Sequence, residues 1–456
     1  MNDDIITLIS RDGKDKITCF KYMEECFQKE GYISSKKLYI NLLYKLFNFA
    51  ILRKIRVFFT LYLRCKFFFH DPKHIELVIF DCNNTASVEK ILPNKNYVII
   101  STRIEQINKI YVSKKIIFYI VKNLFKRSLK KNYLTVLINV ISPKIVLTHV
   151  SDSEDFHAVS KILHSKIKFI AIQTYNPTMY NEMFSAEAKK NFFIPKLFCY
   201  GKCDELFYKN KKVNIGAYEI TGSLPASLSY EYVKSEKLKI NPNKYDICLI
   251  SEAHETLNGD YPHVKNMADS IGLVAEFTYK LCKKHNLNIV FSGRGKIQSN
   301  KVASRDTYFY KHYLKNYDFK IFQAAPGDER EEDVNYASYL NIMQSRLTIA
   351  VFSTMLREAI SFEKKILSFN TTGHPDVIFP GPGITFPQES ICILTKPSYE
   401  LFEERVLKIL SMTNEEYFSQ LGKEKSFLMA PTVETASILR KRLKQALEYN
   451  ANDNIK

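Results

Sequence analysis

A pair of hydroxyl side chains stands where a predicted buried strand gives way to a predicted helix. The strand spans residues 345–354 and ends in Ser353 and Thr354. Two hydroxyls and the free backbone amides of a helix N-terminus together form a site for a phosphate or a carboxylate. Glu358 follows one helical turn later, where its carboxylate could face a ribose hydroxyl. The alternative is a plain N-cap, because serine and threonine are favoured at that position in any helix.

Two more segments in the same half of the chain could bind an anion. Arg294 stands between Gly293 and Gly295, where a strand predicted over residues 288–295 runs into a glycine-containing loop. Glycine lets the backbone approach an anion closely, and arginine offers a planar fork for phosphate or carboxylate. His374 follows a later predicted strand and could stabilise the charge on a departing phosphate. A solvated arginine in a turn and an ordinary loop histidine are the alternatives.

Acidic and imidazole side chains follow two other predicted strands and could act as a general base. Asp152 comes just after the strand predicted at 143–150, while Glu252 and His254 come after the strand predicted at 245–251. A base must take a proton from the attacking group, so its side chain has to face the reacting atoms. A carboxylate that attacked instead would give a retaining double displacement. Acidic residues in such positions also cap the following helix, which is the alternative for both clusters.

The sequence offers little support for a metal or dinucleotide site. The Gly-x-Gly pair lacks the third glycine of a dinucleotide fingerprint, and the absence of a Walker loop argues against a P-loop kinase. Nine cysteines are scattered without a Cys-x-x-Cys pair, so their spacing does not predict a zinc site. The acidic run at residues 327–335 is typical of a solvated helix start. We therefore expect neither a resident metal nor a cofactor.

Short apolar runs alternate with helical stretches from residue 75 onward. The runs are continuous in Val, Ile, Leu and Phe, as a parallel sheet covered on both faces requires. Strands that alternate with helices indicate a doubly wound α/β sheet. Gly222 and Ser223 close this half and could line the site, although a turn uses the same residues. The predicted strands of this half span residues 74–81, 96–102, 143–150, 168–173, 196–201 and 212–218.

The pattern then starts again after a polar stretch at residues 229–244, which predicts a linker. A helix is predicted over 263–286, and Pro431 and Thr432 are cap signals for a final helix over 431–447. That helix has apolar residues at helical spacing, namely Val433, Ala436, Leu439 and Leu443. The strands predicted for this half span residues 245–251, 288–295, 319–325, 345–354 and 365–373.

These elements predict an α/β protein with two Rossmann-like domains facing a cleft, the GT-B form of nucleotide-sugar glycosyltransferases. Ligands of open α/β sheets bind outside the carboxyl ends of the strands, so the site is expected between the two domains. The predicted division is a basic, apolar and helical N-terminal region at 1–74, an acceptor domain at 75–230, a donor domain at 231–430 and a closing helix at 431–456.

The formal net charge of +18 concerns partners and not fold. Nucleic acid, an anionic membrane face and an anionic substrate all fit it, as does the Lys-rich composition of an AT-rich genome. The chain has no recognisable motif for nucleic-acid binding, and its basic clusters are also apolar. The polar, acidic N-terminus is not a secretory signal, and scattered cysteines suit a reducing compartment. We therefore expect a cytoplasmic protein without a nucleic-acid partner.

Two segments are both basic and apolar, at residues 37–69 and 113–133. Neither contains the run of about 18 apolar residues that a transmembrane helix needs. Lysine or arginine that recurs among Leu, Phe, Tyr and Ile is typical of helices lying on an anionic leaflet. Ordinary core-facing helices with lysine on their polar faces are the alternative. Together the segments predict a protein peripheral to the inner face of the cell membrane.

The segment STMLREAISFEKKILSFN, starting at Ser353, resembles the donor-binding segment of bacterial GT-B glycosyltransferases that build surface carbohydrates such as lipopolysaccharide and capsule. LVIFDCNN, PKIVLTHVSDSEDF and FIAIQTYN resemble blocks of the same family's N-terminal half, with Ser153 in the place of an Asn and Tyr175-Asn176 in the place of Asn-Gly. The resemblance covers roughly residues 75–430 and gives Asp152 the position of the family's Asp.

The resemblance implies metal-independent transfer of a sugar from a nucleotide donor to a glycan or lipid-linked acceptor. Related enzymes use CMP-activated keto acids such as Kdo or a sialic acid, and such a donor suits anion-binding groups because it carries a phosphate and a carboxylate. A polyol-phosphate transferase using a CDP-activated donor, as in teichoic-acid synthesis, is an alternative with the same fold. A non-catalytic carbohydrate- or membrane-binding protein on a degenerate GT-B fold is another.

Overall fold

The chain forms two compact units, one made of Met1–Pro72 and Ile100–Asn123 and the other of Lys73–Ile99 and Leu124–Lys456. The predicted boundary at residue 74 therefore nearly coincides with a boundary between units, but residues 100–123 join the N-terminal region. The computed structural model describes residues 60–81, 85–93, 96–103, 106–123, 128–174, 176, 186–252, 262–296, 309–319, 321–324, 336–373, 379–381, 384, 386–387 and 390–448.

The described part of the first unit is built on a two-stranded parallel sheet of β1 (Lys66–Phe68) and β4 (Lys109–Tyr111). The helix predicted over 37–69 is thus wrong at β1, where two phenylalanines favour a strand once a partner strand is available. Residues 37–59 lie outside the described residues. Helix α6 (Lys114–Lys122) follows β4 in the chain. The basic and apolar segment 113–133 contains all of this helix and the first residues of the next one, α7 (Leu129–Ile141).

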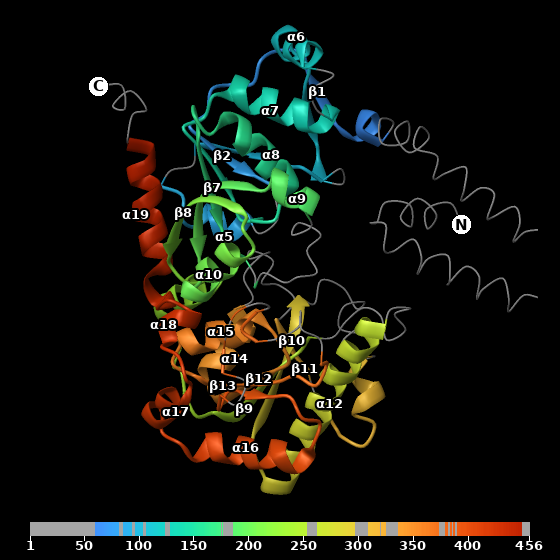
Figure 1. Cartoon of the computed structure of the whole chain (residues 1–456), viewed down its shortest axis with the longest axis vertical. Coiled ribbons are helices and arrows are strands. Elements are labelled where there is room, and N and C mark those ends of the chain that lie inside the picture. Colours follow the sequence, from blue (N-terminus) through green and yellow to red (C-terminus); the bar gives the residue numbers. More distant parts are fainter. Residues whose placement is uncertain are drawn as a thin grey trace, which may run out of the picture. The chain divides into compact units, whose positions relative to one another are not determined.

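The second unit contains two six-stranded sheets (Figure 1), and we call each sheet with its helices a lobe. The N-terminal lobe has the strand order β3-β2-β5-β6-β7-β8, and its pairs from β2 to β8 are parallel. Its strands are β2 (Leu77–Phe80), β3 (Tyr97–Ile100), β5 (Ile145–Thr148), β6 (Lys168–Ile172), β7 (Phe193–Cys199) and β8 (Asn214–Ile220). Its helices are α5 (Thr85–Glu89), α7 (Leu129–Ile141), α8 (Glu154–Leu163), α9 (Ala186–Asn191), α10 (Lys202–Asn210) and α11 (Leu224–Ser235).

The C-terminal lobe has the order β11-β10-β9-β12-β13-β14, and all five pairs are parallel. Counted from β9, this is the order 3-2-1-4-5-6 of a Rossmann sheet. Its strands are β9 (Tyr245–Ile250), β10 (Ile289–Lys296), β11 (Ile321–Ala324), β12 (Ser345–Ala350), β13 (Lys365–Phe369) and β14 (Ile393–Leu394). Its helices are α12 (Pro262–His285), α14 (Tyr336–Met343), α15 (Thr354–Ser361), α16 (Tyr399–Ser411), α17 (Asn414–Gln420) and α18 (Lys425–Leu428).

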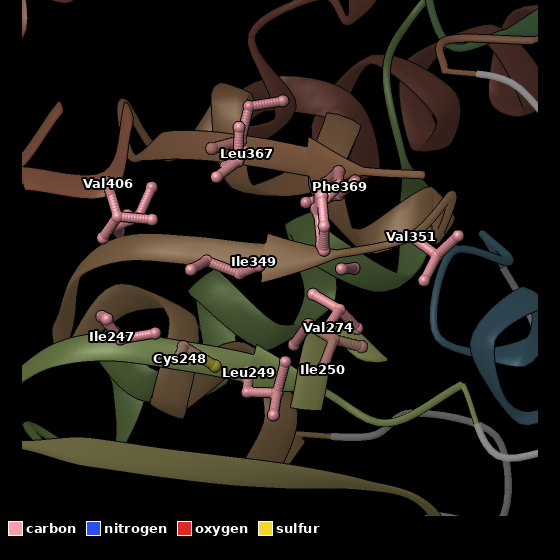
Figure 2. Close-up of a cluster of buried hydrophobic side chains, with 14 of the residues drawn as sticks. Ile247, Cys248, Leu249, Ile250, Val274, Ile349, Val351, Leu367, Phe369 and Val406 are labelled. Carbon is pink, nitrogen blue, oxygen red and sulfur yellow. The ribbon is translucent and has the colours of Figure 1, made fainter. Parts of the chain in front are cut away.

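The core of the C-terminal lobe explains why its strands are continuous apolar runs. Ile247 and Leu249 of β9 and Ile349 of β12 are buried, and Figure 2 shows them beside Leu367 of β13 and Val274 of α12. Helices cover both faces of the sheet, so successive side chains on a strand are all removed from water. Burial of each large aliphatic side chain contributes about 1.5–3 kcal/mol. The predicted α/β class with two Rossmann-like domains is confirmed.

The C-terminal helix α19 (Thr435–Glu448) packs on the N-terminal lobe, beside β8 (Figure 1). Its buried Ala436, Leu439 and Leu443 belong to the same cluster as Leu77 of β2, which confirms a helix that closes the fold. Val433 is exposed instead, because it lies in the short 3-10 helix Thr432–Glu434 before α19 begins.

The predicted linker at 229–244 is wrong over its first part, which belongs to α11. Ser223 caps this helix by accepting a hydrogen bond from the Ala226 amide (3.3 Å), and Pro225 suits the first turn. Leu228 and Val233 are buried, so an apolar face holds the helix in place despite its charged neighbours. The connection from α11 to β9 is therefore limited to residues 236–244.

A buried histidine in α8 makes the stability of the N-terminal lobe depend on pH. His157 packs on Phe192 (4.1 Å between ring centroids), and its Nδ1 donates to the Phe193 carbonyl (3.2 Å). Burial lowers the pKa of His157 to about 4, so the folded state binds its proton less well than the unfolded state. The free energy of unfolding is therefore unaffected by His157 above the usual histidine pKa of about 6.5. It falls by about 3 kcal/mol as the pH drops from there towards 4, because the unfolded state binds the proton first.

Replacing His157 with Gln is expected to remove this part of the acid sensitivity. Urea unfolding of wild type and H157Q between pH 7 and pH 4 measures it, because the difference in unfolding free energy between the two proteins should change across that interval. The exposed His70 supplies the control, since H70Q should follow the wild-type pH dependence. A constant difference in unfolding free energy between H157Q and wild type from pH 7 to pH 4 would show that His157 is not the source of the acid sensitivity.

Candidate functional site

The strand order of the C-terminal lobe reverses between β9 and β12, and ligands of such sheets bind outside the carboxyl ends of the strands at this switch point. Ser251 and Glu252 follow β9, while Ser353 and Thr354 follow β12 and begin α15. Residues about a hundred positions apart are therefore brought to one point of the sheet edge. The sequence predicted both groups, and the sheet order places them together.

The hydroxyl pair lies at the N-terminus of α15, where the sequence predicts it. Ser353 is the N-cap and accepts a hydrogen bond from the Met355 amide (3.3 Å), so its backbone-capping role is present. Thr354 accepts a hydrogen bond from the backbone amide of Asn176 (3.1 Å), which belongs to the N-terminal lobe. Both side chains are half-buried and keep access to the surface. A phosphate contact by these hydroxyls stays a prediction.

Glu252 holds the turn that leads from β12 into α15. Its buried carboxylate accepts hydrogen bonds from the amides of Val351 (2.5 Å) and Phe352 (3.2 Å). Hydrogen bonds to an ionised acceptor are about twice as strong as neutral ones. Glu252 therefore positions the residues just before Ser353, and this contact engages the carboxylate that the sequence predicts as a base. Its role as a base stays a prediction.

Glu358 is buried and bonded by groups of both lobes. Its carboxylate accepts hydrogen bonds from the Ser223 hydroxyl at the start of α11 and from the Tyr339 hydroxyl of α14 (2.9 Å). Burial raises the pKa of Glu358, and these two donors and the neighbouring Arg357 oppose the rise. The structure thus gives Glu358 protein partners in the interior, and the predicted ribose contact has no support from this position.

The sequence predicted that Gly222 and Ser223 line the cleft, but both lie in the interior of the same junction. Ser223 is fully buried against Glu358. Gly222 has a φ of +93°, and a Cβ there would stand 2.7 Å from the hydroxyl oxygen of Thr435. Position 222 needs glycine, because its φ is positive and the segment before α19 packs directly against its Cα, which leaves no room for a side chain.

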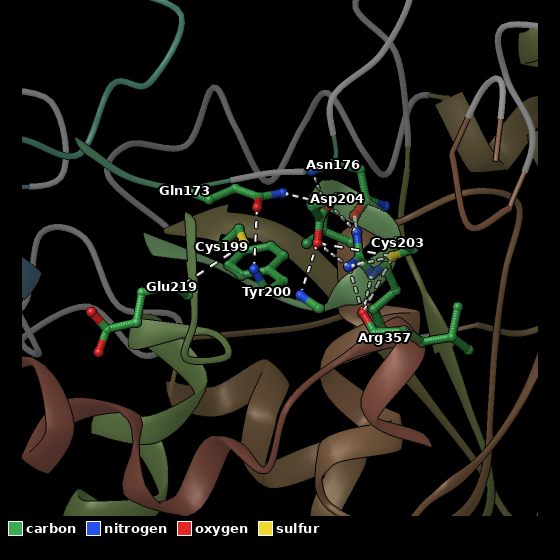
Figure 3. A network of polar contacts seen from close by, with 11 residues as sticks. Gln173, Asn176, Cys199, Tyr200, Cys203, Asp204, Glu219 and Arg357 are labelled. Carbon is green, nitrogen blue, oxygen red and sulfur yellow. Dashed lines mark hydrogen bonds and ion pairs between the residues drawn. The ribbon is translucent and has the colours of Figure 1, made fainter. Parts of the chain in front are cut away.

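The largest polar feature of the junction, which sequence reasoning missed, is a buried ion pair between the lobes (Figure 3). Arg357 of α15 donates from Nη1 and Nη2 to the two carboxylate oxygens of Asp204 in α10, at 2.9 and 2.5 Å. Its Nη1 also donates to Asn176 Oδ1 (2.8 Å), and its Nε donates to the Leu428 carbonyl (2.9 Å). Both charged side chains are fully buried.

Every polar atom of this ion pair has a partner, which is the condition for a buried charge to be tolerated. Gln173 donates to Asp204 Oδ1 and the Gly201 amide donates to Asp204 Oδ2, each at 2.9 Å. Burial acts to lower the pKa of Arg357, but the charge and hydrogen bonds of Asp204 together with the neighbouring Cys203 and Tyr200 outweigh it, so the pKa is raised. A signal existed in the sequence, because Arg357 stands among the apolar residues of an amphipathic helix.

The carboxyl edge of the N-terminal sheet contacts the start of α15. Asn176 follows β6, and its backbone and side chain bind Thr354 and Arg357. Two residues earlier, the Thr174 hydroxyl donates to the carbonyl of His149, which follows β5. These bonds join the ends of β5 and β6 to the hydroxyl pair of the other lobe. The predicted approach of the two carboxyl edges is therefore present at this point.

Asp152 follows β5 at this edge, and the neighbouring strand β2 is followed by a second acid that sequence reasoning missed. The N-terminal sheet reverses its order between β2 and β5, where Asp81 and His149 follow the paired residues Ile79 and Leu147. Asp81 and His149 are both buried, and Asp81 has a φ of +74°, in the left-handed region that aspartate adopts more readily than most residues. Asp152 is half-buried. Asp81 could not be found from the sequence, because the pairing of β2 with β5 is what brings the ends of these two strands together.

Of the remaining predicted site residues, two lie in β10 and two lie outside the described residues. The glycine-containing loop predicted around Arg294 is a strand, because β10 continues to Lys296 with an irregular pairing to β11. Gly293 lies there next to the switch point, and its carbonyl accepts from the Ser338 hydroxyl (3.5 Å). His254 and His374 lie outside the described residues, as does the acidic run 327–335.

The described residues contain neither a cluster of metal ligands nor a helix that could span a membrane. No group of three or more His, Cys, Asp and Glu side chains within that part of the chain could hold a metal ion. None of the helices there combines the length and the apolar character needed to cross a bilayer.

Comparison with known proteins finds distant similarities to solved structures. No family model matches the chain, and no curated protein matches it. UDP-GlcNAc 2-epimerase from Neisseria meningitidis, bound to UDP-GlcNAc, has 12% identity and a TM-score of 0.45, over 81% of this chain and 99% of that one. The wall teichoic acid polymerase TagF has 11% identity and a TM-score of 0.45, over 83% and 91% of the two chains.

A UDP-forming α,α-trehalose-phosphate synthase from Burkholderia xenovorans has 10% identity and a TM-score of 0.42, over 82% of this chain and 98% of that one. Similarity at this level assigns no activity. The strand orders and the closing helix of the chain itself define it as an α/β protein of two Rossmann-like lobes.

Proposed function

We propose that this chain is a GT-B glycosyltransferase that transfers a sugar from a nucleotide-activated donor. The observation that carries the proposal is the switch point of the C-terminal sheet, where Ser353 and Thr354 begin α15 next to the carboxyl edge of the other lobe. A helix N-terminus at a switch point suits a phosphate group. An acceptor at the edge of the N-terminal sheet would then meet the donor where Asn176 contacts Thr354.

In the proposed reaction, Asp152 takes the proton of the acceptor hydroxyl while the acceptor oxygen forms a bond to the anomeric carbon. The bond from that carbon to the donor phosphate breaks, and the nucleotide leaves with the electron pair. Ser353 and Thr354, with Gly293, Arg294 and His374 as further predicted donor contacts, would stabilise the negative charge that develops on the phosphate. Protein groups alone supply these roles.

For the donor we favour a CMP-linked keto-acid sugar, because its phosphate and carboxylate both suit hydroxyl, amide and guanidinium donors. For the acceptor we propose a growing surface polysaccharide or a lipid-linked glycan at the cytoplasmic face of the membrane. A thermal-shift screen over CMP, CDP, UDP and GDP tests the donor class. Stabilisation by one base is expected, and indifference to all of them would overturn the proposal.

Replacing both hydroxyls tests the site. The double variant S353A/T354V should weaken binding of the stabilising nucleotide about 10- to 100-fold, because hydrogen bonds to a charged group are worth about 1.5–3 kcal/mol. Isothermal titration calorimetry measures the change. The matched control is S398A, which removes the N-cap of α16 elsewhere in the same lobe and should leave binding unchanged. Equal affinity of the double variant and wild type would place the nucleotide elsewhere.

Product analysis distinguishes the enzymatic alternative. Mass spectrometry of an acceptor incubated with protein and donor shows the mass of an added sugar for the proposed activity. An added polyol phosphate would instead identify a transferase with a CDP-activated polyol donor. Nucleotide binding without any product, from every donor of the matching base, would indicate a binding protein on this fold.

A further inference from the structure

Helix α6 of the first unit turns bulky apolar side chains towards solvent. Ile117, Phe118 and Val121 are 46%, 63% and 62% exposed, whereas Ile116 on the opposite side of the helix is fully buried. Residues at these spacings share one side of a helix. An amphipathic helix of a globular protein normally buries its apolar side, so α6 carries a second apolar side that the described residues leave exposed.

The exposed side belongs to a helix that is well anchored. Ser113 caps α6 by accepting a hydrogen bond from the Ile116 amide (3.2 Å), and its hydroxyl donates to Asp71. The Val112 amide donates to the Phe68 carbonyl (2.7 Å), which ties the start of α6 to the sheet of β1 and β4. The three apolar side chains are thus presented in a defined position.

Exposed apolar side chains are concentrated in this unit. The described residues contain twelve large hydrophobic side chains that are exposed, and six of them belong to the first unit, although it supplies a minor part of the described chain. Exposed apolar residues that stand singly are normal, whereas three on one side of a single helix form a contiguous patch of the kind that marks an interaction surface. The six are Tyr62, Leu63, Phe69, Ile117, Phe118 and Val121.

The charge around the apolar side identifies the partner. Lys114, Lys115 and Lys122 are exposed on α6, and the helix contains no acidic residue. The preceding segment 37–59 also carries lysine and arginine without any acid. A second copy of α6 would place lysine against lysine, which is unfavourable. An anionic bilayer offers both an apolar interior for the three hydrophobic side chains and phosphates for the lysines.

We propose that α6 binds the surface of an anionic membrane, with Ile117, Phe118 and Val121 inserted at the level of the acyl chains. Lys114, Lys115 and Lys122 contact lipid phosphates around them. This partner deepens the proposed function, on which it rests for its role of bringing the protein to a lipid-linked acceptor. The binding itself depends only on the apolar side and the lysines of α6.

Sedimentation of the full chain with vesicles tests the proposal. Vesicles of equal parts phosphatidylglycerol and phosphatidylcholine should sediment the wild-type protein, and pure phosphatidylcholine should retain much less. The variants I117S/F118S and K114E/K115E should each bind the anionic vesicles at least tenfold more weakly. L238S is the matched control, because Leu238 is a single exposed apolar side chain of the second unit, and it should bind as wild type does.

Thermal unfolding keeps the test interpretable, because substitutions of exposed residues should leave the melting temperature of both double variants near that of wild type. Equal vesicle binding by wild type and both variants would overturn the proposal. A concentration-dependent dimer in light scattering that I117S/F118S abolishes would replace the membrane by a second copy of the chain. Stabilisation by nucleotide is read in the same samples, so a failure of the proposed function is seen separately from a failure of membrane binding.

Discussion

Replacing Arg357 with Met is expected to destabilise the protein by about 3–5 kcal/mol, since loss of one partner leaves the other buried charge without compensation. Asp204 would keep the bonds from Gln173 and Gly201 and the long one from the Cys203 thiol, and the Asn176 and Leu428 oxygens would lose a donor. Because these groups come from both lobes, the loss should be felt by the junction as a whole. Urea unfolding followed by circular dichroism measures the change in free energy of unfolding.

A surface ion pair of the same protein supplies the control. Arg440 of α19 binds the two carboxylate oxygens of Glu231 at 2.7 Å, but both side chains are more than a third exposed. Its replacement by Met should cost no more than about 1 kcal/mol, because solvent screens the pair. Equal effects of R357M and R440M would show that burial of the junction pair contributes nothing.

The double variant R357M/D204L separates the charge effect from packing. Removing both charges avoids the uncompensated carboxylate, so this variant should be more stable than R357M alone. If the double variant were less stable than R357M, the hydrogen bonds of Asp204 to its own lobe would account for most of the effect.

Replacing Asp152 with Asn is expected to lower turnover by about 10²- to 10⁴-fold, because general base catalysis contributes that much and an amide cannot accept the proton. Asp152 follows β5 at the edge that contacts α15, and it is half-buried. Nucleotide affinity should stay within about twofold of wild type, since Asp152 belongs to the acceptor side. Steady-state rates with the donor found by the screen measure the first effect, and calorimetry measures the second.

Glu154 provides the control for Asp152. It stands two residues later in the first turn of α8, where its exposed carboxylate lies 3.5 Å from the Lys131 ammonium. E154Q should leave turnover nearly unchanged. If D152N kept wild-type turnover, the base would have to be another group, and variants of the predicted Glu252 and His254 and of Asp81 would be the next to measure.

Local patterns allowed most elements to be predicted. Continuous apolar runs predicted β2, β5, β6 and β12 because a strand covered on both faces needs no polar positions. The helix over 263–286 coincides with α12 to within a residue at each end. The predictions failed where tertiary contacts outweighed the local pattern. At β1, residues predicted to be helical form a strand because they pair with β4.

The candidate site was predictable only in the parts that a short stretch of chain determines. Ser353 caps α15 through a bond to Met355, two residues away, so its position follows from the sequence alone. Arg357 and Asp204 are 153 residues apart, and Glu358 and Ser223 are 135 residues apart. Periodicity within one segment contains no information on such pairs. The tertiary structure decided them, because the order of parallel strands and the packing of α15 between the lobes determine which distant side chains share one buried space.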